Sequence, residues 1–276
     1  MTQFLYLINL IALGLLMCQA DVPEAPLAPD AADADSMTVP DSDSVVPDTI
    51  EPQFDLTYLM GKFDPTQHPD FVLIDTLYAD RAGLYLRKET YTAFRKMYDA
   101  ARQDGIRLQI RSATRTFGAQ KYIWERKWNG ETTIENGKSA PEAYPDAVTR
   151  ARMILKYSSM PGSSRHHWGT DIDLNAFDNS WFDAGPGLEI YQWLVLHAAK
   201  YGFCQPYTKK GPERPYGYEE ERWHWSYLPL AKPLTQFAAD QLKEEMIGGF
   251  AGAGVAHDLH IVEHYVLGIN PECLND

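Results

Sequence analysis

The acidic residues of this chain are distributed so unevenly that they limit which part of it can fold. Residues 1–61 contain ten Asp or Glu and no Lys or Arg, whereas residues 62–276 contain 28 acidic and 25 basic side chains. Within that acidic part, residues 21–53 are rich in Pro, Asp and Ala and contain no aromatic side chain. Such a segment cannot bury enough apolar surface to offset its conformational entropy. We therefore predict a disordered acidic tether over residues 21–53, followed by a folded body from residue 54.

The first twenty residues, MTQFLYLINLIALGLLMCQA, carry an apolar run from Phe4 to Met17. That run is too short to span a bilayer and has the length of a signal-peptide core. Three interpretations stay open: cleavage after Ala20, attachment of a lipid to Cys18, or a hydrophobic helix of the fold. The first two predict an exported protein of the periplasm or cell envelope, either free or anchored to a membrane through its N-terminal lipid.

The body mixes helical and strand-like patterns. Apolar residues recur with helical spacing in four segments: 88–104, a stretch from Phe117, 146–157 and 189–201. Alternation typical of strands appears over 106–112, 170–174 and 222–228. Because these elements follow one another without a βαβ rhythm, the predicted fold class is α+β. The nearly balanced charge of the body offers no basic face for nucleic acid.

Two stretches bring together the residue types of a hydrolytic metal site. SRHHWGTDID at 164–173 supplies His166 and Asp173, separated by a turn through Gly169, and ERWHW at 221–225 supplies His224. A catalytic zinc ion needs three such ligands and one open position for water. A carboxylate must then take a proton from the water, and Glu221, three residues before His224, can reach it.

Other residues near these ligands have less specific roles. Four aromatic side chains are predicted to wall the site and keep it dry: Trp168, Trp223, Trp225 and Tyr227. Asp171 shares a strand face with Asp173, and it either orients a histidine or makes a hydrogen bond to the backbone. His167 has no place in the ligand pattern, so we interpret it as a structural neighbour.

These motifs resemble those of the VanY-like zinc D-alanyl-D-alanine carboxypeptidases, which belong to the Hedgehog/DD-peptidase fold group. SRHHWGTDID is similar to the family's S-x-H-x-x-G-x-x-x-D element, and ERWHW is similar to its E-x-W-H-W element. Upstream, RSATRTFGAQ resembles S-G-Y-R-S-x-x-x-Q and places Arg115 and Gln120 at the family's arginine and glutamine. Three elements in the same order form a specific signal, which covers roughly residues 70–230.

The resemblance implies a small antiparallel sheet flanked by helices, and a zinc peptidase domain over residues 54–231. It implies Zn²⁺ as cofactor with His166, Asp173 and His224 as ligands, and Glu221 as general base. Arg115 would bind substrate and stabilise the oxyanion. The other implied substrate contacts are Gln120, Ser164 and Trp223. The implied substrates are peptidoglycan stem peptides that lose a terminal D-alanine, in either D,D or L,D linkage.

Some residues depart from the family pattern. Asp171 replaces the usual Ala, Arg222 the usual Pro, and Thr114 the usual Tyr, and these changes bear on substrate choice more than on the metal. Residues 121–160 exceed a minimal member and are expected to form a lid or rim. Two alternatives stay open: a peptidoglycan endopeptidase or D-Ala-D-Ala dipeptidase on the same scaffold, and a zinc-containing wall-binding module without catalysis. The retained Glu221 argues against the second.

The C-terminal part carries two further features. Residues 232–276 lie beyond the resemblance and are predicted to form a helical extension. Cys204 and Cys273 form either a disulfide or two buried thiols, because sequence spacing cannot place them within bonding distance. Three histidines, at 257, 260 and 264, recur with helical spacing. They are interpreted as a polar helix face rather than as a second metal site.

Overall fold

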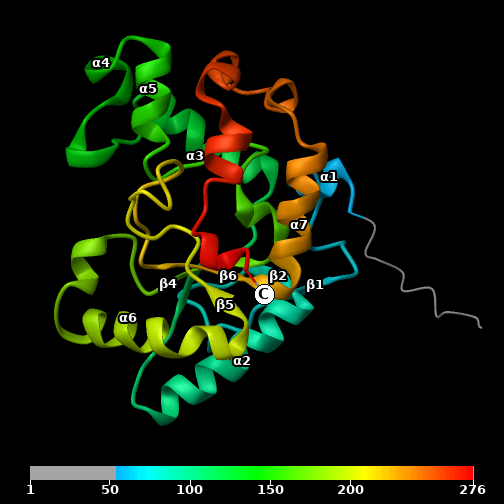
Figure 1. Ribbon diagram of the computed structural model, residues 1–276, viewed down its shortest axis with the longest axis vertical. Coiled ribbons are helices and arrows are strands. Elements are labelled where there is room, and N and C mark those ends of the chain that lie inside the picture. The colour runs from blue at the N-terminus through cyan, green and yellow to red at the C-terminus, as the bar shows by residue number, and fades with distance from the viewer. Residues whose placement is uncertain (1–53, 276) are drawn as a thin grey trace, which may run out of the picture. The chain divides into compact units, whose positions relative to one another are not determined.

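The structure, a computed structural model, describes residues 54–275 (Figure 1). The predictions for residues 1–53, including the signal segment, the Cys18 lipid and the tether, lie outside the described residues. In the part of the chain that is described, no helix is both long enough and apolar enough to cross a membrane. The described residues combine helices with short antiparallel strands, so the predicted α+β class is confirmed.

A four-stranded antiparallel sheet with the order β3-β4-β6-β5 lies at the centre of the fold. Its strands are β3 Ile110–Ser112, β4 Asp171–Leu174, β5 Phe203–Cys204 and β6 His224–Tyr227. The register pairs Asp173 with His224 and Asp171 with Ser226. Two candidate metal ligands from distant parts of the chain are thus held directly opposite each other on neighbouring strands.

The strand predicted over residues 106–112 is shorter in the structure and starts only at Ile110. Asn175, which has a left-handed φ of 63°, ends the partner strand. Its side chain then bonds the backbone of the preceding segment, accepting from the Gln109 amide and donating to the Arg107 carbonyl. These residues therefore pair with a side chain instead of with a strand.

A smaller sheet and several helices surround the central sheet. The smaller sheet pairs β1 Phe71–Leu73 with β2 Tyr85–Arg87. The helices are α1 Leu56–Leu59, α2 Lys88–Gln103, α3 Phe117–Trp128, α4 Ala140–Ala143, α5 Ala147–Ile154, α6 Gly185–His197 and α7 Leu228–Gln241. The four predicted helices are all present, although α6 begins four residues earlier than expected and continues into a 3₁₀ turn, Ala198–Tyr201.

The central sheet separates two apolar cores, and its strand alternation decides which side chains enter them. Ile172, Leu174 and Trp225 point into the core that contains residues of α2 and α6. Asp171 and Asp173 alternate with these apolar residues and therefore lie on the opposite face. In Figure 1, α2 and α6 run along one side of the sheet, whereas α3, α4 and α5 lie on the other. The polar face of the sheet is consequently buried between the two parts of the molecule.

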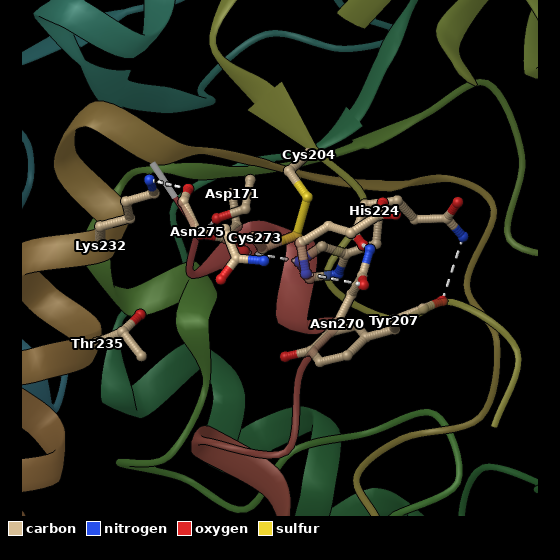
Figure 2. The surroundings of a disulfide bond; sticks show 12 residues. Asp171, Cys204, Tyr207, His224, Lys232, Thr235, Asn270, Cys273 and Asn275 are labelled. Atoms are coloured by element: carbon tan, nitrogen blue, oxygen red, sulfur yellow. Dashed lines mark hydrogen bonds and ion pairs between the residues drawn. A yellow bond between two sulfur atoms is a disulfide. The ribbon is translucent and has the colours of Figure 1, made fainter. Parts of the chain in front are cut away.

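The C-terminal residues belong to the second core rather than to a separate layer. The expected boundary between residues 231 and 232 falls inside α7, whose Leu234 and Ala238 belong to the same core as Trp124 of α3. Beyond α7 the chain forms short 3₁₀ turns and one π-helical turn, Ile261–Val266. A disulfide joins Cys204 of β5 to Cys273, across a Cα–Cα distance of 5.7 Å (Figure 2).

Candidate metal centre and active site

His166 is carried on a 3₁₀ turn, Arg165–Trp168, that ends at Gly169 with a φ of 73°. A Cβ at Gly169 would lie 2.4 Å from the ring of Phe71, so this turn requires glycine. The Nδ1 of His166 donates to the carbonyl of Ala113 at 2.8 Å. That bond holds the proton on Nδ1, so the lone pair of Nε2 is available to a metal. Nε2 lies 3.2 Å from Oδ2 of Asp173.

Whereas His166 uses its Nε2, His224 directs its Nδ1 toward Asp173. Its Nδ1 lies 3.3 Å from Oδ1 of Asp173 and 3.1 Å from Oε2 of Glu221. Its Nε2 lies 2.9 Å from Oδ1 of Asp171. One ligand atom from each of His166, Asp173 and His224 lies within 4.8 Å of the other two. The structure thus brings together the three residues named as ligands and places the carboxylate of Glu221 beside them.

Two polar atoms at this point have no hydrogen-bond partner among the described residues: Nε2 of His166 and Oδ1 of Asp173. Both side chains are almost completely buried, with 2% and 4% of the residue exposed. Buried polar atoms without partners cost about 1–3 kcal/mol each. A divalent cation between them would satisfy both, and two imidazoles with one carboxylate form a ligand set typical of zinc. The residues therefore fit the metal that the resemblance implies.

The electrostatics of the cluster also favour a cation. Burial raises the pKa of Glu221 above its usual value. Burial opposes a charge on His224 as well, but its hydrogen bonds to Asp171 and Glu221 dominate and raise its pKa to about 9. Burial likewise disfavours ionised Asp173, yet the neighbouring His166 and His224 lower its pKa to about 2. The carboxylates thus create a negative potential at the place where the ligand atoms converge.

Asp171 is the centre of a buried network that fixes His224. Besides His224, its carboxylate accepts from the hydroxyls of Thr170 and Ser226 and from Nε of Arg165 at 3.3 Å. Of the two interpretations of Asp171, the structure supports contact with a histidine. A carboxylate on the second nitrogen of a metal-binding imidazole sets its tautomer and orientation. Only Nδ1 of His224 is then left to bind a metal.

The network reaches across the fold to α7. The guanidinium of Arg165 donates to Ser226 Oγ and to Thr235 Oγ1, both at 2.9 Å. Arg165 is 1% exposed, so its charge is balanced by Asp171 inside the protein rather than by solvent. Figure 2 shows Thr235, Asp171 and His224 in the neighbourhood of the disulfide. The candidate ligand His224 is consequently anchored to the C-terminal part of the chain.

A cavity of about 630 Å³ opens above the ligands. Its lining includes the three candidate ligand residues and four others that the sequence had singled out: Arg115, Ser164, Glu221 and Trp223. Arg115 lies with one guanidinium nitrogen 3.8 Å from Oδ2 of Asp173, so it stands at the metal end of the cavity. The cavity therefore joins the candidate metal centre, the candidate base and a fixed cation in one space.

Gln120 does not line the cavity, contrary to the substrate contact that the resemblance implied. Its Oε1 accepts from Arg115 at 3.0 Å, and its Nε2 donates to the carbonyl of Ser159. The amide is completely buried and both of its ends are engaged. Gln120 thus holds Arg115 in place and is not available to a ligand.

Three of the four aromatic residues predicted to wall the site are not in the cavity lining; only Trp223 is. Trp225 and Tyr227 alternate with His224 along β6, so they face the other side of the sheet. Trp168 packs in the second core, where its indole donates to the Leu59 carbonyl. The alternation that brings Asp173 and His224 to one face of the sheet thus turns Trp225 and Tyr227 away from the cavity.

His167 and the C-terminal histidines stand apart from the metal centre. His167 bridges two segments, with one ring nitrogen 2.6 Å from the Arg115 carbonyl and the other accepting from the Gly162 amide. The expected single helix face at 257, 260 and 264 is wrong, because His260 has a φ of 50° and separates a 3₁₀ turn from a π-helical turn. Within residues 54–275, the only group of His, Cys, Asp or Glu suited to a metal is that of His166, Asp173 and His224.

Several cavity residues carried no signal in the sequence because they belong to no motif. They are Tyr157, Ser158, Phe177, Tyr218 and Lys127, among others. Tyr157 and Phe177 contact Trp223, with ring centroids 6.2 and 6.4 Å apart. Part of the segment 121–160, namely the end of α3 and residues 157–159, contributes to the cavity wall.

Comparison with known proteins agrees with this geometry. Over 175 residues the chain is 28% identical to the putative carboxypeptidase YodJ of Bacillus subtilis (strain 168), which covers 62% of this chain and 56% of that protein. Over 134 residues it is 29% identical to a D-alanyl-D-alanine carboxypeptidase of Enterococcus faecalis (strain ATCC 700802 / V583). This match covers 49% of this chain and 45% of that protein. The chain thus spans about half the length of these curated relatives.

Solved structures and a family model were compared in the same way. The structure of the LdcB LD-carboxypeptidase aligns with a TM-score of 0.45 and 21% identity, covering 74% of this chain and 81% of that one. The family model described as VanY, D-alanyl-D-alanine carboxypeptidase, matches residues 83–230, which include Arg115, both ligand motifs and Glu221. Because this match extends over more than half of the chain, the protein belongs to the VanY D-alanyl-D-alanine carboxypeptidase family.

Proposed function

We propose that this protein is a zinc-dependent carboxypeptidase that removes the terminal D-alanine from peptidoglycan stem peptides. The observation that carries the proposal is the position of Glu221, whose carboxylate lies 3.1 Å from Nδ1 of His224 in the same cavity as the partnerless atoms of His166 and Asp173. His166, Asp173 and His224 would hold the zinc ion. When bound, zinc supplies a Lewis acid that makes water more acidic and polarises a carbonyl group.

The protein's own groups would handle the proton and the developing charge. Burial raises the pKa of Glu221, so its carboxylate takes a proton from the attacking water more readily than an exposed glutamate would. The same group then returns the proton to the leaving amine. Arg115, held by Gln120, offers fixed N–H donors to the carbonyl oxygen as that oxygen becomes negative. Trp223 and the buried walls of the cavity restrict access of bulk water.

Replacing the base tests the proposal. Glu221→Ala should lower kcat by about 10²–10⁴-fold, because general base catalysis contributes that much, while the three ligands still bind zinc. Turnover is measured by mass spectrometry of digested muropeptides, and zinc by elemental analysis of the same samples. Full activity in Glu221→Ala would refute the assigned base. Loss of one alanine identifies a carboxypeptidase, whereas split cross-links identify an endopeptidase, and sacculus binding without any product identifies a wall-binding module.

We also propose that the protein acts outside the cytoplasm. The signal-like residues 1–20 support this location, as does the Cys204–Cys273 disulfide, since such bonds persist in oxidising compartments. Its peptidoglycan substrates lie in the same place. Fractionation of cells that express the full chain, with and without a Cys18→Ala change, would establish export and separate a lipid anchor from a soluble form.

A further inference from the structure

One positive charge in the cavity has no role in the mechanism above. Lys127, near the end of α3, is half-buried and lines the same cavity as Glu221 and Arg115. Its ammonium donates to Ser158 Oγ. Within the described residues no carboxylate forms an ion pair with it, and an ammonium has three protons to donate. Lys127 therefore has donors left for a ligand.

The surroundings of Lys127 would be improved by a negative charge. Burial and, to a smaller extent, the nearby guanidinium of Arg115 lower the pKa of Lys127. The carboxylate of Glu221 acts in the opposite direction but offsets only part of that shift, so the charged form of Lys127 is disfavoured where it stands. A cation held beside another cation costs free energy unless an anion lies between them. The cavity thus contains a place where an anionic group would be stabilised from two sides.

Uncharged donors complete this place. Ser164 and Tyr218 also line the cavity; the Ser164 hydroxyl has no hydrogen-bond partner within residues 54–275, whereas the Tyr218 hydroxyl interacts with Ser159 and Ser163. Both side chains are deeply buried, with 1% and 2% of the residue exposed. A carboxylate accepts about four hydrogen bonds, which matches an ammonium together with several hydroxyls. Buried hydroxyls without partners are uncommon in proteins unless a ligand completes them.

The two cations of the cavity have different settings, which suggests different ligands. Arg115 is tied to Gln120 and lies 3.8 Å from Asp173, so it belongs to the metal end where the carbonyl oxygen would be. Lys127 contacts Ser158 instead and makes no ion pair with Asp173. A peptide substrate of a carboxypeptidase brings two oxygen groups into the site, the carbonyl that is attacked and the free carboxylate at its end.

We propose that Lys127, with the hydroxyls of Ser158 and Ser164, binds the C-terminal carboxylate of the substrate. Lys127 is then a residue that determines specificity, because it selects peptides that end beside the scissile bond. Arg115 is left to stabilise the oxyanion. This inference rests on the proposed carboxypeptidase function and adds to it the group that recognises the free chain end.

The test compares two synthetic peptides that differ only at the chain end. One ends in D-Ala-D-Ala with a free carboxylate, and the other carries a C-terminal amide in its place. The zinc-loaded wild type should hydrolyse the acid about 10- to 100-fold more efficiently than the amide, which is the worth of hydrogen bonds to a charged group. Lys127→Met should lower kcat/KM for the acid by a similar factor, mostly through KM, and should affect the amide much less.

Two variants control for the loss of a charge and of a side chain. Lys121→Met removes a lysine from the same helix whose ammonium donates to the Gly249 carbonyl, outside the cavity, and should retain the wild-type preference for the acid. Lys127→Arg keeps the positive charge and should restore part of that preference. If Lys127→Met does not fold, as judged by circular dichroism, Ser164→Ala provides the same comparison of acid with amide.

The outcomes separate this inference from the proposed function. Equal losses for acid and amide in Lys127→Met would show a structural role and overturn the carboxylate site. A wild type that cleaves acid and amide equally would also overturn it, yet would leave a working hydrolase. A zinc-loaded wild type that cleaves neither peptide nor any muropeptide would refute the proposed function itself.

Discussion

The two walls of the cavity differ in how their polar groups are satisfied. We call the wall formed by β4, β6, the 3₁₀ turn Arg165–Trp168 and Glu221 the strand wall. The wall formed by α3, residues 157–164 and Tyr218 is called the helix wall. In the strand wall, His166, Asp171 and His224 each have a fixed partner, and the remaining free atoms converge on one point. In the helix wall, the Ser164 hydroxyl has no hydrogen-bond partner and the Lys127 ammonium forms no ion pair among residues 54–275.

The difference indicates that the two walls of the site bind groups of opposite charge. The strand wall carries an excess of carboxylates and is preorganised for a cation, whereas the helix wall carries donors and suits an anion. A metal and a substrate carboxylate would therefore be held by separate sets of residues. Changes in one wall should alter metal content, and changes in the other should alter catalysis with the metal retained.

The largest effect that would sharpen this comparison is loss of the metal. His224→Ala removes one of three ligands, so zinc content after purification should fall well below one ion per chain and activity should disappear. Elemental analysis measures the zinc. His264→Ala serves as the matched control, because that ring stacks on Tyr216 and lies outside the metal group. Unchanged zinc in His224→Ala would remove this residue from the ligand set.

A smaller effect is expected from changing Asp171, which contacts the candidate ligand His224. Asp171→Asn keeps the shape of the side chain but removes the charge that balances Arg165 and orients His224. Loss of such a supporting carboxylate typically weakens metal affinity about 10- to 100-fold. Competition with a zinc-binding dye measures the affinity. An affinity equal to that of the wild type would mean that His224 is held by the sheet alone.

The smallest effect concerns the helix wall and should leave the metal untouched. Gln120→Met removes the amide that positions Arg115, and kcat should fall about tenfold because a hydrogen bond to a charged group is lost. Zinc content should equal that of the wild type. A parallel drop in zinc and kcat would contradict the independence of the two walls, and steady-state kinetics with metal analysis on one preparation would detect it.

The convergence of the candidate ligands and the candidate base could be predicted from the sequence because local rules placed these side chains. Strand alternation put Asp171 and Asp173 on one face, a glycine allowed the turn after His166, and the spacing of Glu221 from His224 put a carboxylate near the same point. The major helices were predicted for the same reason, since their apolar periodicity is a local property. The resemblance then implied zinc as the metal and peptidoglycan stem peptides as the substrate class.

Contacts between distant segments were not predictable in this way. Gln120 has the expected residue type, but its rotation toward Ser159 and Arg115 depends on where α3 packs. Lys127 and Tyr218 belong to no motif and reach the cavity only in the folded chain. The sequence left a disulfide and two free thiols as alternatives, and only the fold, which places β5 beside the C-terminal turn, decides for the disulfide.

The sequence by itself therefore determined the candidate chemistry: which side chains could hold a cation, which could move a proton, and which secondary structures carry them. Only the tertiary structure decided which polar groups are already satisfied and which remain free. The physical reason is that alternation and turn geometry act over a few neighbouring residues. The partner of a buried hydrogen-bonding group, in contrast, comes from whichever segment packs against it.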